Sequence, residues 1–297
     1  MSTPRMFVKS NVTPLAADGG GGGDRRIGAL LLGAGRITPE QLDRVLRAQK
    51  DDRRRFGQIA VDLQFCSDGD IRQALGKQFE FPYLEPGADG ISEEVSAAYR
   101  PSGRDVEALR ALRTQLKLRW FDGATTGRAL AIISPRHGDG RSYLASNLAV
   151  GFAQLGERTL LIDADMRRPR QHHLFQLPDA SGLSTILAGR DDEGAIQRVP
   201  QLTNLAVLPA GPMPPNPVEL LERSAFSRLL EQLRNDYDVI LVDTPAAAEH
   251  PDAHTATVRC HAGLMVVRKN ATRVAEARAL ADAVRSAEIV GTVMNEF

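Results

Sequence analysis

A glycine-rich segment near the middle of the chain has the composition of a phosphate-binding loop. Residues 134–142 read Ser-Pro-Arg-His-Gly-Asp-Gly-Arg-Ser, and residues 143–155 follow with the pattern of an amphipathic helix. Gly138 and Gly140 let the backbone wrap closely around an anion with its N–H groups turned inward, and the helix N-terminus adds partial positive charge. We therefore expect a nucleotide phosphate site formed by His137, Gly138, Asp139, Gly140, Arg141, Ser142 and Tyr143.

This loop departs twice from the standard pattern G-x-x-x-x-G-K-[ST]. Ser134 lies six positions before Gly140, and Arg141 stands where that pattern has lysine. Arginine keeps the positive charge and can hold two phosphate oxygens at once, but its planar fork is larger than the compact ammonium group of lysine. Ser142 is placed to ligate Mg²⁺ through its hydroxyl. Taken alone, the segment also fits a glycine-rich turn without a ligand.

Three aspartates stand at the ends of two further apolar runs. Asp163 and Asp165 end the run that starts at Leu160, and Asp243 ends the run that starts at Val239. Because the carboxyl ends of parallel strands meet at one edge of a sheet, these carboxylates should converge on the ligand, hold Mg²⁺ and orient an attacking group. A single aspartate at a strand end is often only a helix N-cap, but three beside a phosphate loop favour a nucleotide site. The predicted metal ligands are Ser142, Asp163 and Asp243.

Strands and helices must alternate from Arg128 onward to bring these residues together. The apolar runs are Ala129–Ile133, Thr159–Ile162, Leu205–Leu208, Val239–Val242 and Gly263–Val267, and helical patterns separate them. Such short runs are typical of parallel strands that are buried on both faces. Upstream, residues 105–120 have the spacing of an amphipathic helix. The sequence therefore predicts an α/β fold with a parallel sheet flanked by helices.

The N-terminal third contains an internal repeat. Residues 26–49 and 55–78 align without gaps, and each half has the pattern of a short helix, a turn and a second helix. In the first half Thr38 is a candidate N-cap, with Pro39 at the first helical position and Gln41 three residues after the cap. Such a repeat should bury one shared core. We expect a disordered lead at 1–23, a small, mainly helical domain at 24–85, a linker at 86–103 and the phosphate-loop domain at 104–297.

Composition excludes several classes of protein. The 297 residues carry 37 basic and 37 acidic side chains, so no overall positive field attracts nucleic acid. Cys66 and Cys260 give no disulfide framework, and the six histidines show no metal-ligand spacing. No stretch approaches the roughly 20 apolar residues of a membrane-spanning helix, and the N-terminus lacks a signal-peptide pattern. We expect a protein that is made and kept in the cytoplasm, and whose contact with a membrane would go through a partner.

Three segments together resemble the bacterial tyrosine kinases of exopolysaccharide assembly, the BY-kinases. The segments are 134–142, LLIDADMRRP at 160–169 and VILVDTP at 239–245, which match the family's Walker A, A′ and B motifs. Residues 211–221, from Gly-Pro-Met-Pro-Pro-Asn-Pro onward, also fit. These kinases are part of the MinD/ParA branch of phosphate-loop proteins. The resemblance covers roughly residues 104–297 and implies a MinD/ParA-like sheet.

The resemblance implies transfer of the γ-phosphoryl group of ATP to tyrosine, with ATP and Mg²⁺ bound. Ser142 and Asp243 would bind Mg²⁺, and Asp163 would position or deprotonate the attacking hydroxyl. Asp165 would lie close to the metal, and Arg141 would contact the β- and γ-phosphates. Because Arg141 replaces the family's lysine, nucleotide binding is a firmer expectation than turnover.

A second departure concerns the acceptor. Family members usually end in a tyrosine-rich tail, whereas the tyrosines of this chain are dispersed, at Tyr83, Tyr99, Tyr143 and Tyr237. Tail autophosphorylation is therefore not expected. In this respect, and in its loop arginine, the chain is similar to the EpsG-like subgroup of chain-length-determinant kinases. The family role implies a membrane-spanning polysaccharide co-polymerase as partner.

The helix upstream of the sheet carries a second family pattern. Glu107, Arg110 and Arg113 match an E-x-x-R-x-x-R helix, which in relatives packs subunits into a ring. The resemblance thus implies a homo-oligomer with these residues at its interface. The same spacing also fits a salt-bridged surface helix.

The N-terminal repeat resembles the MshEN module at the head of type II secretion ATPases, and some of these modules bind cyclic di-GMP. An arginine can stack on guanine and pair with phosphate, while glycine permits close backbone approach. Gln64 and Cys66 replace a glycine and an isoleucine in the second half. A ligand-free docking domain is the alternative. The residues implied for cyclic di-GMP are Arg26, Gly28, Gly35, Gln49, Arg55, Gly57 and Gln78.

Three functions remain open at this point. The first is an ATP-dependent tyrosine kinase that regulates exopolysaccharide chain length and export, tuned at its N-terminal domain. The second is a non-kinase switch whose ATP-bound state controls the polysaccharide machinery. The third is a MinD/ParA-type ATPase, which is disfavoured because Arg136 stands where that group has an early lysine. In the kinase, Asp163, Asp165 and Arg141 would be the catalytic residues.

Overall fold

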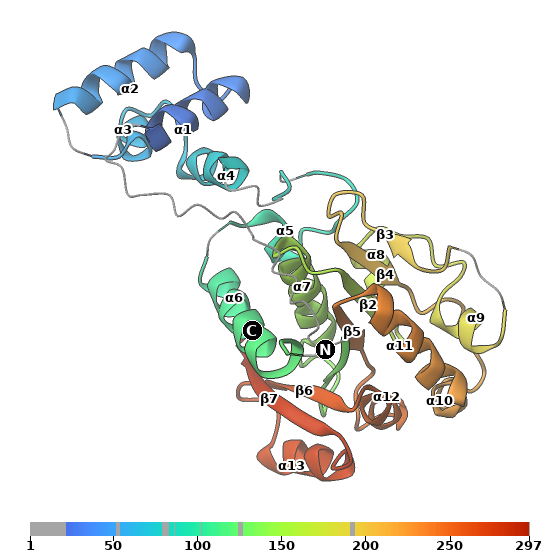
Figure 1. The fold of residues 1–297 in the computed structure, drawn as a ribbon. Helices are drawn as coiled ribbons and strands as arrows, with labels where there is room; N and C mark the ends of the chain where they lie inside the picture. Colours follow the sequence, from blue (N-terminus) through green and yellow to red (C-terminus); the bar gives the residue numbers. More distant parts are fainter. Residues whose placement is uncertain are drawn as a thin grey trace, which may run out of the picture. The chain divides into compact units, whose positions relative to one another are not determined.

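The computed structural model describes residues 22–51, 54–78, 83–85, 87–101, 103–123, 127–190 and 194–296. The chain divides into two compact units, with the boundary between Glu80 and Phe81. Unit 1 holds the helical repeat and unit 2 holds the sheet (Figure 1). The predicted lead, residues 1–23, lies outside the described residues except for Gly22 and Gly23, which begin the first helix.

Unit 2 is built on a sheet that contains seven strands among the described residues, in the order β3-β4-β2-β5-β1-β6-β7. All neighbours pair in parallel except β3 and β4. The strands are β1 (Arg128–Ile133), β2 (Thr159–Asp163), β3 (Gln197–Arg198), β4 (Leu205–Leu208), β5 (Val239–Asp243), β6 (Ala262–Arg268) and β7 (Glu288–Asn295). Each predicted apolar run forms a strand, so the predicted α/β class is confirmed.

Helices cover both faces of this sheet (Figure 1). One face packs against α5 (Ser96–Tyr99), α6 (Arg104–Leu116), α7 (Arg141–Gln154) and α8 (Gln171–Leu174). The other face packs against α9 (Leu183–Leu187), α10 (Pro217–Glu222), α11 (Ser224–Asp236), α12 (Asp252–Cys260) and α13 (Val274–Ala283). Along β1, Leu130 and Ile132 belong to the first core and Ala131 to the second, as the two-residue period of a strand requires.

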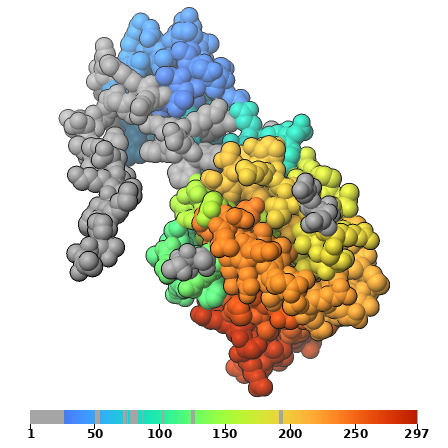
Figure 2. Space-filling model, turned by 45° about the vertical axis from the view of Figure 1, so that its right-hand side comes forward, coloured from blue at the N-terminus to red at the C-terminus, as the bar shows by residue number. Residues whose placement is uncertain are grey.

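The last strand of the chain, β7, is an outer strand of the sheet and pairs only with β6 among the described strands. In Figure 2 the red residues of this C-terminal part form the lower edge of the unit 2 body. Among the described residues, no helix combines the length and the apolar character needed to cross a membrane.

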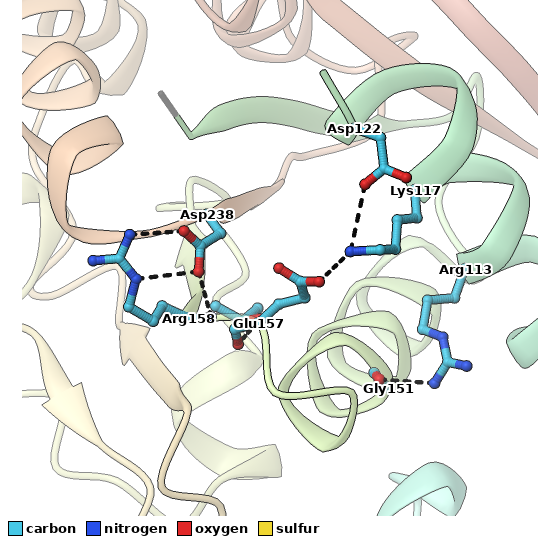
Figure 3. A network of polar contacts seen from close by, with 8 residues as sticks. Arg113, Lys117, Asp122, Gly151, Glu157, Arg158 and Asp238 are labelled. Carbon is cyan, nitrogen blue, oxygen red and sulfur yellow. Dashed lines mark hydrogen bonds and ion pairs between the residues drawn. The ribbon is translucent and has the colours of Figure 1, made fainter. Parts of the chain in front are cut away.

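An ion-pair network fastens the amino-terminal edge of the sheet (Figure 3). Arg158 precedes β2 and pairs with Asp238, which precedes β5, at 2.7 Å. The hydrogen bond from Arg158 lowers the pKa of Asp238. Lys117 lies in η1 (Lys117–Phe121), the π-helical turn that continues α6, and it pairs with Glu157 after α7. A single exposed ion pair adds little to the free energy of unfolding. The main effect of the network is therefore to align β2 with β5 and α6 with α7.

The residues predicted to form a linker, 86–103, are instead part of unit 2. They include α5 and contribute Ile91, Val95 and Ala98 to the buried core. The backbone N–H of Leu84 donates to the carbonyl of Ala98 at 2.8 Å, which folds the segment back on itself. The glycines and prolines of this segment predicted a linker. Its few apolar residues are too widely spaced to show a helical or strand period, so the pattern did not indicate that the segment packs on the sheet domain. We call residues 83–101 the strap.

Unit 1 confirms the helix-turn-helix reading of both halves of the repeat. Its helices are α1 (Gly22–Gly33), α2 (Pro39–Asp51), α3 (Phe56–Asp62) and α4 (Asp68–Gln78). Thr38 and Gln41 form the predicted reciprocal cap, with N–H to side-chain oxygen distances of 2.8 and 3.3 Å. Ser67 and Asp70 repeat this cap 29 positions later. Both halves therefore use the same turn chemistry around one core.

Helix packing explains the glycines that the two halves of the repeat share. A Cβ on Gly28 would lie 2.6 Å from Leu42 Cδ1, and a Cβ on Gly57 would lie 2.8 Å from Ile71 Cγ2. These glycines allow the first helix of each half to approach the second closely. The two positions thus have a structural role that is independent of any ligand.

We expect Gln64→Gly to stabilise unit 1 by about 1 kcal/mol, because Gln64 holds a left-handed backbone with φ of 57°. Its repeat partner Gly35 adopts the same conformation, with φ of 65°, without a Cβ. Hydrogen exchange of the α3 and α4 amides would measure the change. The reciprocal variant Gly35→Gln should destabilise unit 1 by a similar amount, and a change of the same sign in both variants would contradict the prediction.

Candidate nucleotide-binding site

The glycine-rich loop joins the carboxyl end of β1 to the start of α7. Gly138 has φ of 81°, and Gly140, which caps α7, has φ of 101°, so both need the left-handed conformations that favour glycine. His137 and Gly138 are exposed at the tip. Within the described residues, the amides of residues 137–141 donate to no protein acceptor. This arrangement of free amides before a helix of 14 residues matches the predicted anion cradle.

Asp139 holds the loop in shape rather than facing a ligand. Its carboxylate is buried and accepts from the backbone N–H of Arg136 at 2.9 Å and from the hydroxyl of Thr272 at 2.9 Å. Its carbonyl accepts from Asn295 Nδ2 at 2.9 Å. Asp139 was predicted as part of the phosphate loop, and these bonds leave its backbone N–H free for that role.

Arg141 is buried beneath the loop, which differs from the exposed phosphate contact that its position suggests. Its Nε donates to the carbonyl of Thr244 at 2.7 Å, and its Nη1 donates to the carbonyl of Arg136 at 2.8 Å and to the hydroxyl of Ser134. Three of five N–H groups therefore support the loop and the end of β5. Nη2 has no protein partner among the described residues, so only this end of the guanidinium is left for a phosphate.

Asp163 accepts three backbone hydrogen bonds, one at Oδ1 and two at Oδ2. Its carboxylate accepts from the N–H groups of Asp165 at 3.1 Å and of Arg170 and Gln171, both at 2.9 Å. Asp163 thus fixes the turn into α8, but it is not the helix N-cap that was weighed as the alternative, since Arg170 occupies that position. Asp165 accepts from the N–H of Arg168 at 2.9 Å in the same turn. Both aspartates do lie at the carboxyl end of β2, as predicted.

Asp243 lies directly opposite Asp163, since the two residues are register partners of β5 and β2. Asp243 Oδ2 accepts from Gln171 Nε2 at 2.7 Å, and the nearby Ser142 hydroxyl lowers the pKa of the same carboxyl group. Asp243 Oδ1 and Gln171 Oε1 are buried and have no partner among the described residues. Two unpaired buried oxygens beside a hydroxyl are the ligand type that Mg²⁺ prefers. The residues present therefore fit a magnesium ion.

Burial raises the pKa of both strand-end carboxyl groups. It raises the pKa of Asp243 to about 6, against the lowering effects of Arg141 and Gln171. Burial, with the charge of Asp243, raises the pKa of Asp163 well above its ordinary value. A divalent cation that binds these groups must therefore displace protons at acidic pH.

We expect this burial to appear in the pH dependence of stability. A carboxyl group with a raised folded-state pKa stabilises the fold below its ordinary pKa, and that stabilisation is lost as the pH rises through the folded pKa. For Asp243 the loss between about pH 4 and pH 7 is about 3 kcal/mol. Denaturant unfolding of the ligand-free protein and of Asp243→Asn at several pH values would measure it. The difference between the two curves isolates Asp243, and a difference that is independent of pH would contradict the prediction.

A groove of about 870 Å³ opens beside the loop, between α6, the start of α7 and the end of β7. Its lining includes apolar Leu109, Leu112 and Met294 together with Tyr143 and Asn295. Asn295 connects the groove to the loop through its bond to Asp139. A mostly apolar hollow next to a phosphate cradle has the character needed for a nucleotide base. The predicted site residue Tyr143 thus faces the groove, and its hydroxyl is 3.0 Å from Ser96 Oγ.

The predicted subunit-interface arginines have partners within their own chain. Arg110 bonds to Glu107 at 2.5 Å, to the Tyr83 hydroxyl at 2.5 Å and to the carbonyl of Pro101 at 2.7 Å. Arg113 donates to the carbonyl of Gly151 at 2.9 Å. Of the three, Glu107 is the most exposed, at 61%. The motif thus fastens α6 to the strap and to α7.

The candidate cyclic di-GMP residues are spread over unit 1. The side chains of Arg26 and Gln78 lie outside the described residues. Arg55 is exposed at the start of α3, and Gly35 is exposed at the end of the first turn. Gln49 lies near the end of α2.

Sequence reasoning missed Gln171, which is fully buried at the centre of the site. It links Asp163, Asp243 and the carbonyl of Ser142 through its backbone N–H and its side-chain amide. The sequence did offer a signal for its place in the site. Gln171 is the second residue after Pro169, at the point where the turn that follows β2 must bring the chain back to the sheet. The roles of Thr272 and Asn295 left no such signal, since they come from distant loops.

Comparison with known proteins gives consistent matches for unit 2. A family model described as cellulose biosynthesis protein BcsQ matches residues 128–284. The putative tyrosine-protein kinase CapB of Staphylococcus aureus is 34% identical over 202 residues, 67% of this chain and 87% of CapB. The kinase domain of the Escherichia coli tyrosine kinase ETK superposes with a TM-score of 0.66 at 30% identity, over 73% of this chain and 85% of that one. The Pyrococcus furiosus cell division ATPase MinD has the same fold, with a TM-score of 0.51 at 25% identity over 57% of this chain and 72% of that one.

Proposed function

Because this chain belongs to the family of bacterial tyrosine kinases, we propose that unit 2 binds Mg–ATP and transfers its γ-phosphoryl group to tyrosine. The single observation that carries this proposal is the pair of unpaired buried oxygens, Asp243 Oδ1 and Gln171 Oε1, beside Ser142. Such oxygens are costly in a folded protein unless a ligand completes them. Asp243 ends β5, and the loop begins at the carboxyl end of the neighbouring strand β1, so these oxygens and the loop amides lie at the same edge of the sheet.

The residues of the site have distinct roles in this proposal. The amides of residues 137–141 and Nη2 of Arg141 bind the phosphates, and the groove beside Tyr143 holds the base. Ser142 and Asp243 hold Mg²⁺, with Asp163 opposite. The metal supplies charge neutralisation for the β- and γ-phosphates when bound. The phenol oxygen of the acceptor attacks the γ-phosphorus in line with the departing ADP, and Asp163 takes up its proton.

The wider role follows from the relatives. We propose that the protein works with a membrane-spanning polysaccharide co-polymerase in exopolysaccharide chain-length control, from the cytoplasmic side of the inner membrane. The exposed Glu107 supports a subunit contact on α6. Cyclic di-GMP binding by unit 1 rests on the MshEN resemblance and on the exposed Arg55. Calorimetry with cyclic di-GMP would test it, and equal heats for the protein and for Arg55→Ala would count against it.

A nucleotide-bound switch without transfer remains the second candidate, because Arg141 is committed largely to internal bonds. Labelled ATP and Mg²⁺ with a glutamate–tyrosine copolymer as acceptor would separate the two functions. Label on tyrosine supports the kinase, whereas tight binding without transfer supports the switch. Absence of Mg–ATP binding by calorimetry would refute both.

Asp163→Asn is the control for the assignment of the base. It should abolish transfer and retain nucleotide binding if Asp163 accepts the proton. Since Asp163 also bonds the backbone of α8, the variant must first be shown to unfold cooperatively. Persistent transfer in a folded Asp163→Asn protein would assign the proton acceptor elsewhere.

A further inference from the structure

A second groove, of about 570 Å³, lies on the face of β7 opposite the groove beside Tyr143. It opens between the ends of β6 and β7 and the start of α13, the helix drawn in red beside these strands in Figure 1. Part of its lining is apolar, as at Val267 and Ile289. Of their lining residues the two grooves share only Thr292 and Met294, both on β7. The second groove is therefore distinct from the hollow assigned to the nucleotide base.

The second groove is lined by four cations and, among the described residues, by no carboxylate. The cations are Arg268, Lys269, Arg273 and Arg278, and all four are exposed. Lys269 pairs with Glu296 at 2.8 Å. The three arginines form no ion pair within the part of the chain that the structure describes. Because the whole chain carries 37 basic and 37 acidic side chains, the groove is a local excess of positive charge on a neutral protein.

Two large apolar side chains are exposed among these cations. Val274, the first residue of α13, is 69% exposed, and Met294, near the end of β7, is 62% exposed. Both line the second groove. Such a combination is typical of surfaces that rest on anionic lipid, where apolar side chains enter the headgroup region and cations stay at the phosphates. Nucleic-acid bases stack on aromatic side chains, and the described lining contains none, which disfavours single-stranded nucleic acid.

We propose that the second groove and its rim are a docking surface for an anionic lipid membrane. Arg268, Arg273 and Arg278 contact the phosphates of the headgroups, and Val274 enters the boundary between the headgroups and the acyl chains. The contact is with the membrane surface, since no described helix is able to span a bilayer. A few cations and one apolar side chain give weak, reversible binding, which adds to the contact that a membrane-spanning partner provides.

The docking surface is joined to the phosphate loop by two contacts. Thr272 lines the second groove, and its hydroxyl donates to the Asp139 carboxylate at 2.9 Å. Glu276 on α13 pairs with Arg136 of the loop at 2.6 Å. Docking therefore places the proposed nucleotide site close to the membrane surface. Lipid binding itself requires neither nucleotide nor phosphoryl transfer, so its test is independent of the proposed function.

The first experiment measures lipid binding of the full chain by co-sedimentation with vesicles. One set of vesicles is phosphatidylcholine with about a third phosphatidylglycerol, and the other is pure phosphatidylcholine. We expect binding to the anionic vesicles to be at least about 10-fold tighter at about 0.1 M NaCl. The difference should disappear at about 1 M NaCl, where the Debye length falls from about 10 Å to about 3 Å. Equal binding to both kinds of vesicle at low salt overturns the proposal.

The second experiment locates the surface. The double variant Arg273→Gln, Arg278→Gln should weaken binding to anionic vesicles about 25-fold, since each cation near such a surface contributes a factor of about five. The matched variant Arg190→Gln, Arg228→Gln removes the same charge from exposed positions outside the groove and should weaken binding less than about twofold. Val274→Ser should weaken binding at low and at high salt, because apolar insertion is not screened. Equal losses in the two double variants overturn the assigned surface.

An acidic protein segment is the other occupant that the charge of the second groove would accept. Polyglutamate is therefore titrated into the full chain under the same low-salt conditions. We expect anionic vesicles to bind more tightly than polyglutamate, because only a membrane takes up Val274. Polyglutamate binding that is lost in Arg273→Gln, Arg278→Gln, without binding of anionic vesicles to the unmodified chain, would assign the groove to an acidic partner and overturn the lipid proposal.

Discussion

Replacing Asp243 with asparagine should lower the Mg²⁺-dependent affinity for ATP by at least about 100-fold, because loss of even an outer partner of a metal ligand costs 10–100-fold. The substitution removes the negative charge of the buried carboxylate, whose Oδ1 has no protein partner among the described residues. Transfer to tyrosine should fall by a still larger factor, since the metal also neutralises the developing charge. Calorimetric titration of ATP at several Mg²⁺ concentrations would measure the effect.

Two comparisons make this result specific. Asp236→Asn removes an exposed carboxylate at the end of α11 and should leave ATP affinity unchanged. Without Mg²⁺, the wild-type protein and Asp243→Asn should bind ATP equally weakly. If Asp243→Asn keeps the full Mg²⁺ dependence, the metal lies elsewhere and the proposed site is wrong.

Replacing Arg141 with methionine should destabilise unit 2 by about 3 kcal/mol, because several buried acceptors lose their donors at about 1 kcal/mol or more each. The acceptors are the carbonyls of Thr244 and Arg136 and the hydroxyl of Ser134. Loss of the positive charge beside Asp243 should also raise the pKa of that carboxyl group further. Urea unfolding monitored by the fluorescence of Trp120 would measure the change in free energy.

Arg141→Lys is the matched variant, since it keeps the charge. A lysine ammonium presents its donors from one atom and cannot reach three acceptors that a planar fork spans. We expect a smaller loss of stability than in Arg141→Met, with nucleotide binding retained. Equal stability of the arginine and methionine proteins would show that the inward bonds contribute nothing.

The strand pattern of unit 2 could be predicted from the sequence because each strand is buried on both faces and therefore reads as a continuous apolar run. Asp163 and Asp243 each end one of these apolar runs, which predicted their places at strand ends. The register of β2 and β5 confirms that these two ends are neighbours. In unit 1 the cap at Thr38 was predictable because it is a local interaction over three residues.

Side-chain direction could not be predicted in the same way. Arg141 was expected to contact the phosphates, but the carbonyl of Thr244, 103 positions away in sequence, accepts from its Nε and draws most of the guanidinium inward. Asp139 is directed by Thr272 from the loop that follows β6. The strap failed as a linker for the same reason, since its packing partners lie on α7 and α8. Spacing identifies the residues of a site, whereas the long-range contacts decide which atoms face the ligand.

The strap also decides where unit 2 can be cut. Asn147 on α7 accepts from the N–H of Ala97 at 2.8 Å, and Gln154 donates to the carbonyl of Ala97 at 2.9 Å. A recombinant fragment that starts at residue 104 would strip these partners from α7 and uncover the apolar surface beneath Val95 and Ala98, so it should aggregate on expression. A fragment that starts at Phe81 keeps that surface covered, so it should stay soluble although it is the longer of the two.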